Sequence, residues 1–143
     1  MINVLIVDDS VTIRGMLTYV LQGDRDIKVA VAENVAEAEA LLDSDHFDVI
    51  TLDQEMPGVC GLAYLEILVK RHDIPVIMLS SATRKGADFR TTALLAGAVG
   101  CFDKADAVRC APELIKLVKA AAHRHARIAP DDRAAMRERL ITS

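Results

Sequence analysis

Acidic residues follow two of the apolar runs in this sequence. Asp8 and Asp9 come directly after the run Ile2–Val7, and Asp53 comes directly after the run Val49–Leu52. If these runs are strands of one parallel sheet, their carboxyl ends meet at one edge and gather three carboxylates in one crevice. Two unit charges about 4 Å apart repel by about 4 kcal/mol at an effective dielectric of about 20, and a hard divalent cation removes that cost. Because Mg²⁺ prefers carboxylate and other oxygen ligands, the pattern predicts a magnesium site at Asp8, Asp9 and Asp53.

A hydroxyl and an ammonium group follow two further apolar runs. Ser80 comes after Pro75–Leu79, and Lys104 comes shortly after Val99–Phe102. A metal ion and an ammonium group neutralise negative charge, a hydroxyl donates a hydrogen bond, and an aspartate such as Asp53 can act as a nucleophile. These are the parts needed for phosphoryl transfer, which depends on positioning and charge neutralisation. Taken singly, each of these residues is explained as well by a structural role, as a helix cap, a turn residue or a solvated side chain. The prediction of a phosphoryl-transfer site therefore rests on finding all of them together at strand ends.

The order of apolar segments predicts the elements that position these groups. Five apolar runs alternate with five helical patterns, which indicates an α/β domain with a parallel sheet covered on both faces. We expect a doubly wound (βα)5 fold with the flavodoxin-like strand order 2-1-3-4-5 and a short C-terminal helical tail. The expected strands are Ile2–Val7, Ile27–Ala32, Val49–Leu52, Pro75–Leu79 and Val99–Phe102. The expected helices are Val11–Gln22, one after Asn34, one around Leu62–Val69, a weaker one at Ala87–Ala96, and Pro112–Ala122.

Charge is distributed unevenly along the 143 residues, whose net charge is −4. Five arginines against three acidic residues give 123–143 a net charge of +2, which leaves −6 on the first 122 residues. An acidic body is not typical of a nucleic-acid-binding domain, and no apolar run approaches the roughly 20 residues that a membrane span needs. The three cysteines contain no CxxC pair, which favours a reducing cytoplasm. We expect one domain at 1–122 and a basic extension at 123–143 that is helical or partly disordered.

Four segments together resemble the receiver domains of bacterial two-component response regulators. They are LIVDDS (5–10), DVITLDQEMPG (48–58), PVIMLSSA (75–82) and GCFDK (100–104), and the resemblance covers roughly residues 1–122. It implies that Asp53 accepts a phosphoryl group from a histidine kinase or a histidine phosphotransfer protein. It also implies that Asp8, Asp9, Asp53 and the backbone carbonyl of Glu55 hold Mg²⁺.

The same resemblance implies how the signal leaves the site. Lys104 would pair with the phosphoryl oxygens, and Ser80 would be the switch hydroxyl that moves toward them. A downstream protein effector would bind the face formed by the fourth helix, fifth strand and fifth helix. We expect a cytoplasmic monomer or weak dimer, no nucleic-acid or membrane partner, and no enzymatic activity beyond self-phosphorylation and self-dephosphorylation. The stretch SSATRKG (80–86) and Glu55 resemble the receivers of chemotaxis methylesterases in particular.

Some residues depart from the receiver pattern and leave alternatives open. Cys101 stands at the usual aromatic switch position, Ala105 replaces the proline after the lysine, and Cys60-Gly61 replaces Asp-Gly. The main alternative function is a Mg²⁺-dependent phosphatase of the haloacid dehalogenase type, although that class needs an aspartate at the position of Ser10. A flavodoxin-like cofactor binder is less compatible, because the Asp8-Asp9 pair would repel a phosphate. Whether the chain stands alone or belongs to a longer regulator stays open.

Overall fold

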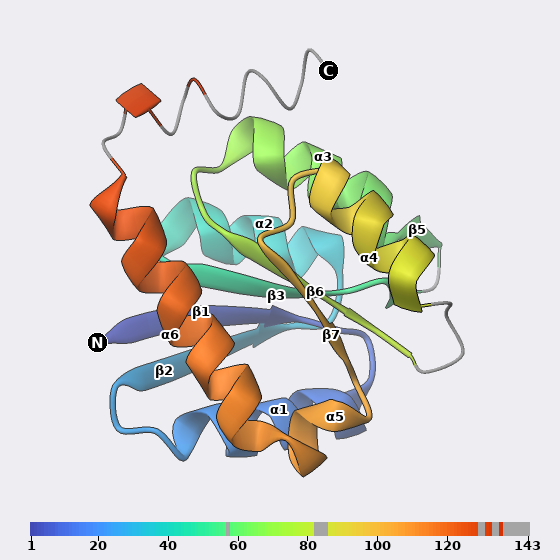
Figure 1. The fold of residues 1–143 in the computed structure, drawn as a ribbon, viewed down its shortest axis with the longest axis vertical. Helices are drawn as coiled ribbons and strands as arrows, with labels where there is room; N and C mark the ends of the chain where they lie inside the picture. The colour runs from blue at the N-terminus through green and yellow to red at the C-terminus, as the bar shows by residue number, and fades with distance from the viewer. Residues whose placement is uncertain (57, 82–85, 129–130, 133–134, 136–143) are drawn as a thin grey trace.

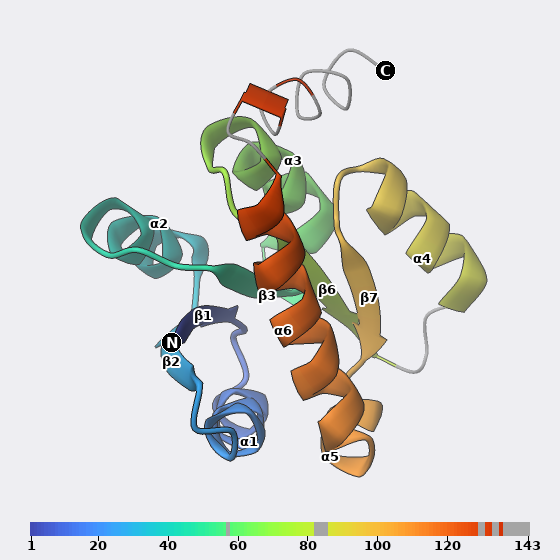
Figure 2. The same cartoon turned by 60° about the vertical axis from the view of Figure 1, so that its left-hand side comes forward.

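The structure is a computed structural model that describes residues 1–56, 58–81, 86–128, 131–132 and 135. Five parallel strands form the central sheet in the order β2-β1-β3-β6-β7, which matches the predicted order 2-1-3-4-5 of the parallel strands. Figure 2 shows the strands in this order. The strands are β1 (Ile2–Val7), β2 (Ile27–Ala32), β3 (Val49–Asp53), β6 (Val76–Ser80) and β7 (Gly100–Asp103).

Helices cover both faces of the sheet (Figure 1). On one face, Leu17 and Leu114 pack with Ile6 and other strand residues; on the opposite face, Leu65 packs with Leu5. Consecutive strand residues therefore enter different cores, which is why the strands read as continuous apolar runs. The first face carries α1 (Val11–Gln22), α5 (Asp106–Arg109) and α6 (Ala111–Arg127); the other carries α2 (Val35–Ser44), α3 (Gly61–Arg71) and α4 (Gly86–Leu95).

Side chains cap the first turns of two helices. The hydroxyl oxygen of Ser10 accepts a hydrogen bond from the backbone N–H of Ile13 at 3.3 Å, which caps α1. The side-chain oxygen of Asn34 accepts from the N–H of Glu37 at 2.9 Å, which caps α2. Each cap satisfies a backbone donor that the helix cannot pair internally.

Some elements differ from the sequence expectation. A short antiparallel hairpin, β4 (Glu55–Met56) and β5 (Val59–Cys60), and the short helix α5 were not predicted, because such short elements show no hydrophobic period. Helix α6 runs to Arg127, beyond the predicted end at Ala122, because an exposed last turn needs no apolar residue. The predicted tail helix around residues 131–141 falls largely outside the described residues. Within the described part of the chain, no helix is both long and apolar enough to cross a bilayer.

Candidate functional site

The predicted site residues lie together at the carboxyl edge of the sheet. Asp8 follows β1, Asp53 is the last residue of β3, Ser80 is the last residue of β6, and Lys104 follows β7. Strand pairing fixes this arrangement, since β1 lies beside β3, β3 beside β6, and β6 beside β7. In open α/β sheets this edge is where ligands bind.

The three aspartates form a compact cluster. Asp8, Asp9 and Asp53 each offer a carboxylate oxygen within 4.8 Å of the others. Asp8 and Asp53 are each only 1% exposed, whereas Asp9 is exposed. The sequence prediction that these three carboxylates converge is therefore met by their positions in the structure.

Among the described residues, Lys104 brings an ammonium group directly to this cluster. Its Nζ lies 2.6 Å from Oδ1 of Asp53 and 3.8 Å from Oδ2 of Asp8. The N–H of Lys104 donates to the carbonyl oxygen of Ser80 at 2.9 Å, so the end of β6 fixes the start of the lysine loop. An ammonium group positioned in this way neutralises charge on Asp53 and can do the same for a group bound to it.

Backbone donors hold the two buried carboxylates in place. Oδ1 of Asp53 also accepts from the N–H of Glu55 at 2.9 Å, and Oδ1 of Asp8 accepts from the N–H of Ser10 at 2.9 Å. The guanidinium of Arg14 donates to the backbone oxygen of Asp8 at 2.7 Å, a contact the sequence did not indicate. One oxygen of each carboxylate is thus fixed, and the orientation of the other oxygen follows.

Burial dominates the electrostatics of the site. It raises the pKa of Asp53 to about 6, against the opposing effects of Lys104 and the Glu55 N–H. Burial likewise raises the pKa of Asp8. Burial alone would lower the pKa of Lys104, but its hydrogen bond to Asp53 and the nearby carboxylates raise it overall. The three carboxylates thus carry more negative charge than the one ammonium group among the described residues of the site neutralises.

The unsatisfied oxygens of this cluster fit a divalent cation. Within the described part of the chain, Oδ2 of Asp8 and Oδ2 of Asp53 are buried and accept no hydrogen bond. Buried carboxylate oxygens without donors are costly, and a hard cation would satisfy both while Asp9 contributes from the exposed side. Bound there, Mg²⁺ would neutralise negative charge at the Asp53 carboxylate.

Ser80 and Glu55 extend the site toward the loop that follows β6. Ser80 is half-buried at the strand end, and no hydrogen bond joins its hydroxyl to Asp53 among the described residues. Oε1 of Glu55 instead accepts hydrogen bonds from the hydroxyl of Ser81 at 2.7 Å and from its N–H at 3.3 Å. The sequence singled out Glu55 for its backbone carbonyl, as a metal ligand, and for its resemblance to chemotaxis methylesterase receivers. The structure places the Glu55 carboxylate on the Ser81 loop.

The glycine of the Cys60-Gly61 pair has a role that sequence reasoning missed. A Cβ on Gly61 would lie 2.5 Å from the Cα of Gln54 and 2.6 Å from the backbone oxygen of Asp53. The N–H of Gly61 donates to the carbonyl oxygen of Gln54 at 3.0 Å, so the first turn of α3 packs directly on the end of β3 that carries Asp53. The sequence did contain a signal for this contact, because a glycine stands directly before a helical pattern and soon after Asp53.

Comparison with known families assigns the chain to a class. The family model of the response regulator receiver domain matches residues 4–117, so the chain belongs to the response regulator receiver family. The phosphatase alternative receives no support from this match. Among solved structures, the response regulator domain of Thermotoga maritima CheB is similar, with a TM-score of 0.77, 34% identity, and coverage of 91% of this chain and 99% of that one.

The curated relatives place the chain nearer to one group within that family. It is 43% identical over 123 residues to a protein-glutamate methylesterase/protein-glutamine glutaminase from Agrobacterium fabrum, covering 84% of this chain and 35% of the relative. A Caulobacter vibrioides protein of the same name, numbered 1, is 40% identical over 119 residues, covering 82% of this chain and 35% of the relative. The chain therefore spans about a third of the length of these relatives.

These relatives correct one expectation from the sequence. The chain was expected to have no enzymatic activity beyond its own phosphorylation and dephosphorylation, whereas the proteins it resembles are named as enzymes. The expectation was wrong because it weighed only the chemistry at one strand edge, whereas the similarity connects the chain to larger enzymes of which it matches the receiver part.

Proposed function

We propose that this receiver accepts a phosphoryl group on Asp53 from the phosphohistidine of a histidine kinase or a histidine phosphotransfer protein. The observation that carries the proposal is the convergence of Asp8, Asp9 and Asp53 with the Nζ of Lys104 2.6 Å from Asp53. A response regulator from Burkholderia pseudomallei, 25% identical with a TM-score of 0.69, was solved with a phosphorylated aspartic acid, a calcium ion and citrate. The match covers 88% of this chain and 72% of the Burkholderia pseudomallei chain.

The two oxygens of Asp53 have different surroundings. Oδ1 is held by Lys104 and the Glu55 N–H, whereas Oδ2 accepts no hydrogen bond within the described residues and is the oxygen left for a cation. The carboxylate of Asp53 attacks the phosphorus atom, the phosphorus–nitrogen bond of the donor breaks, and its electron pair stays on the imidazole. Lys104 then pairs with a phosphoryl oxygen. Asp8, Asp9, Asp53 and the Glu55 carbonyl would hold Mg²⁺, which would supply the remaining charge neutralisation.

In this proposal, the conformational change on phosphorylation begins at the end of β6. A phosphoryl group on Asp53 offers acceptors to the hydroxyl of Ser80, and movement of Ser80 displaces the loop that begins at Ser81. The output face is formed by α4, β7 and α6, and the apolar side chains of Leu94 and Leu95 on α4 are exposed there. Because the relatives are named methylesterases, we propose that this face controls an effector of that kind in a chemotaxis-type pathway. Amide shifts along α4 and β7 on phosphorylation test this step.

Phosphorylation with a small donor tests the central claim. The protein is incubated with acetyl phosphate and Mg²⁺, and intact mass is measured with and without base treatment. We expect one base-labile phosphoryl adduct in the wild type and in Asp43→Asn, whose aspartate is exposed on α2, and no adduct in Asp53→Asn. An adduct that persists in Asp53→Asn, or one that survives base, would assign the nucleophile to another residue.

A further inference from the structure

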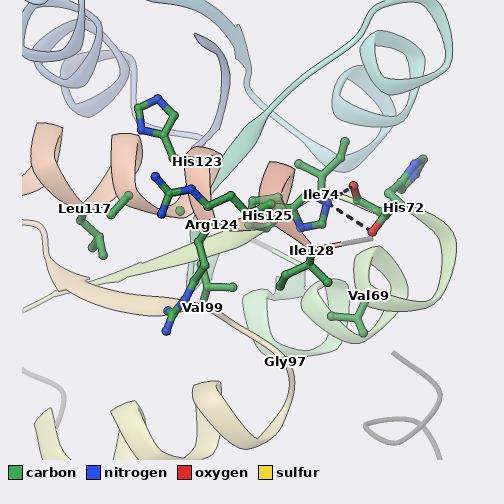
Figure 3. Close-up of a pocket in the computed structure, with 15 residues that line it drawn as sticks. Val69, His72, Ile74, Gly97, Val99, Leu117, His123, Arg124, His125 and Ile128 are labelled. Atoms are coloured by element: carbon green, nitrogen blue, oxygen red, sulfur yellow. Dashed lines mark hydrogen bonds and ion pairs between the residues drawn. The ribbon is translucent and has the colours of Figure 1, made fainter. Parts of the chain in front are cut away.

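A second hollow lies at the opposite edge of the sheet from the aspartate cluster. It has a volume of about 760 Å³ and lies at the amino ends of β6 and β7, between the last turns of α3 and α6. Figure 3 shows the side chains that face it. We name it the α3–α6 groove; its lining includes Val69, Ile74, Val99, Leu117, Arg124 and Ile128.

The floor of the groove is apolar. Ile74 and Leu117 are half-buried there, and Val99, which directly precedes β7, is 41% exposed. Small-molecule sites have volumes of roughly 300–1,000 Å³ and apolar linings with a few polar groups. The α3–α6 groove matches that description in both size and lining.

The rim of the groove is basic. His123, Arg124 and Arg127 line it from the last turns of α6 and are exposed. Within the described residues, Arg124 and Arg127 form no ion pair. The acid on the rim, Asp73, is already engaged, because Nε2 of His125 lies 2.9 Å from its backbone oxygen and 3.3 Å from Oδ1 (dashed lines in Figure 3). Basic residues at the end of a helix offset its dipole, but that role does not require an apolar hollow below them.

Another hollow on the molecule lacks this combination. It lies between α1 and α5, where Val11, Tyr19 and Val108 are exposed, and its lining contains no charged residue. An apolar surface without charge has no electrostatic preference for an anion. The α3–α6 groove is therefore the better candidate for a ligand that combines an apolar body with negative charge.

We propose that the α3–α6 groove binds a small organic anion with an apolar body. The body lies on Ile74, Val99 and Leu117, and the acid group pairs with Arg124 and Arg127. Guanidinium groups suit this role because they form paired hydrogen bonds with carboxylate and similar anions. The proposal does not depend on phosphorylation of Asp53, and it holds whichever effector the receiver controls.

Two matched dyes test the proposal on the whole chain. Anilinonaphthalene sulfonate carries an aromatic body and an anion, and N-phenylnaphthylamine has a similar body without the charge. Binding is followed by fluorescence titration, and the site is mapped by methyl NMR shifts. We expect saturable binding of the sulfonate at one site, with shifts at Ile74, Val99 and Leu117.

Variants separate the charge from the apolar floor. In Arg124→Gln/Arg127→Gln we expect the Kd of the sulfonate to rise about tenfold, the worth of one charge-assisted hydrogen bond, and that of the neutral dye to stay within about twofold. Ala120→Trp, which fills an exposed edge of the groove, should weaken both dyes. Lys116→Gln, on α6 outside the groove, should weaken neither.

Three results would overturn the proposal. The first is that the arginine variant binds the sulfonate as tightly as the wild type. The second is that methyl shifts appear at Val11 and Val108, which would place the dye in the uncharged hollow. The third is that the sulfonate does not bind at all while the wild type is folded and accepts a phosphoryl group from acetyl phosphate. That last result would leave the proposed receiver function intact.

Discussion

The two edges of the sheet hold charge in different ways. At the carboxyl edge, Asp8 and Asp53 are buried and held by backbone N–H groups at the ends of β1 and β3. At the amino edge, Arg124 and Arg127 are exposed at the end of α6 and have no ion-pair partner among the described residues. Strand ends therefore build a site with fixed geometry, whereas helix ends build one whose charged groups can adapt to a ligand.

The charged groups at the two edges of the sheet also differ in how they affect the free energy of unfolding. Buried carboxylates with unsatisfied oxygens cost stability, so the carboxyl edge should gain stability from any cation or charge that reaches it. Exposed arginines remain hydrated and carry no such cost. Substitutions at the two edges should thus differ sharply in their effect on the free energy of unfolding.

Replacing Lys104 should have the largest effect. Lys104→Met leaves Asp53 and Asp8 buried without their ammonium partner, and breaking such a pair costs about 3 kcal/mol. Urea unfolding in EDTA measures the change in the free energy of unfolding. The control is Lys116→Met on the exposed face of α6, expected to stay within about 0.5 kcal/mol of the wild type. Equal effects of the two substitutions would contradict the role assigned to Lys104.

Gly61 tests the rigidity of the same edge. In Gly61→Ala the new Cβ meets backbone atoms of Gln54 and Asp53, which cannot move aside as a side chain can, so we expect a loss of about 2–3 kcal/mol. Gly15→Ala is the matched control, because nothing lies within 4 Å of a Cβ there. Since Gly15 is inside α1, that change should stabilise the protein by about 0.5–1 kcal/mol. Thermal unfolding of both variants checks the opposite signs.

The pH dependence of stability should reveal the buried acids. The folded-state pKa of Asp53 is about 6, above its ordinary 3.8, so the folded state binds more protons than the unfolded state between these values. The free energy of unfolding without metal should therefore fall, by about 2 kcal/mol, as pH rises from about 4 to 6. Asp8 acts in the same direction. The acids Glu39 and Asp24 have lowered pKa values and act in the opposite direction.

The variant Asp53→Asn isolates the contribution of Asp53 to the pH dependence of stability. The difference in unfolding free energy between wild type and variant, measured in EDTA across this pH range, removes the effect of the other acids. We expect the variant to be more stable than the wild type at pH 7 and to gain less from added Mg²⁺. A difference that is flat with pH would show that Asp53 titrates normally.

The sequence predicted the fold and the aspartate cluster for one physical reason. Strands buried on both faces read as apolar runs, so Asp8 and Asp53 could be placed at strand ends before any contact was known. The contact between Glu55 and Ser81 could not be predicted, because it depends on the path of two loops. The α3–α6 groove was equally hidden, since its lining comes from segments as far apart as 69–75 and 117–128.

Removing the groove arginines should have the smallest effect on stability. Arg124→Gln/Arg127→Gln breaks no ion pair within the described residues, and glutamine keeps nearly the helix propensity of arginine, so the free energy of unfolding should change by less than about 0.5 kcal/mol. Phosphorylation of Asp53 by acetyl phosphate should also keep its rate, because the groove lies at the opposite edge of the sheet. Urea unfolding and the phosphorylation time course measure both. A loss as large as that in Lys104→Met would mean that these arginines hold the fold together, and the contrast between a fixed carboxyl edge and an adaptable amino edge would fail.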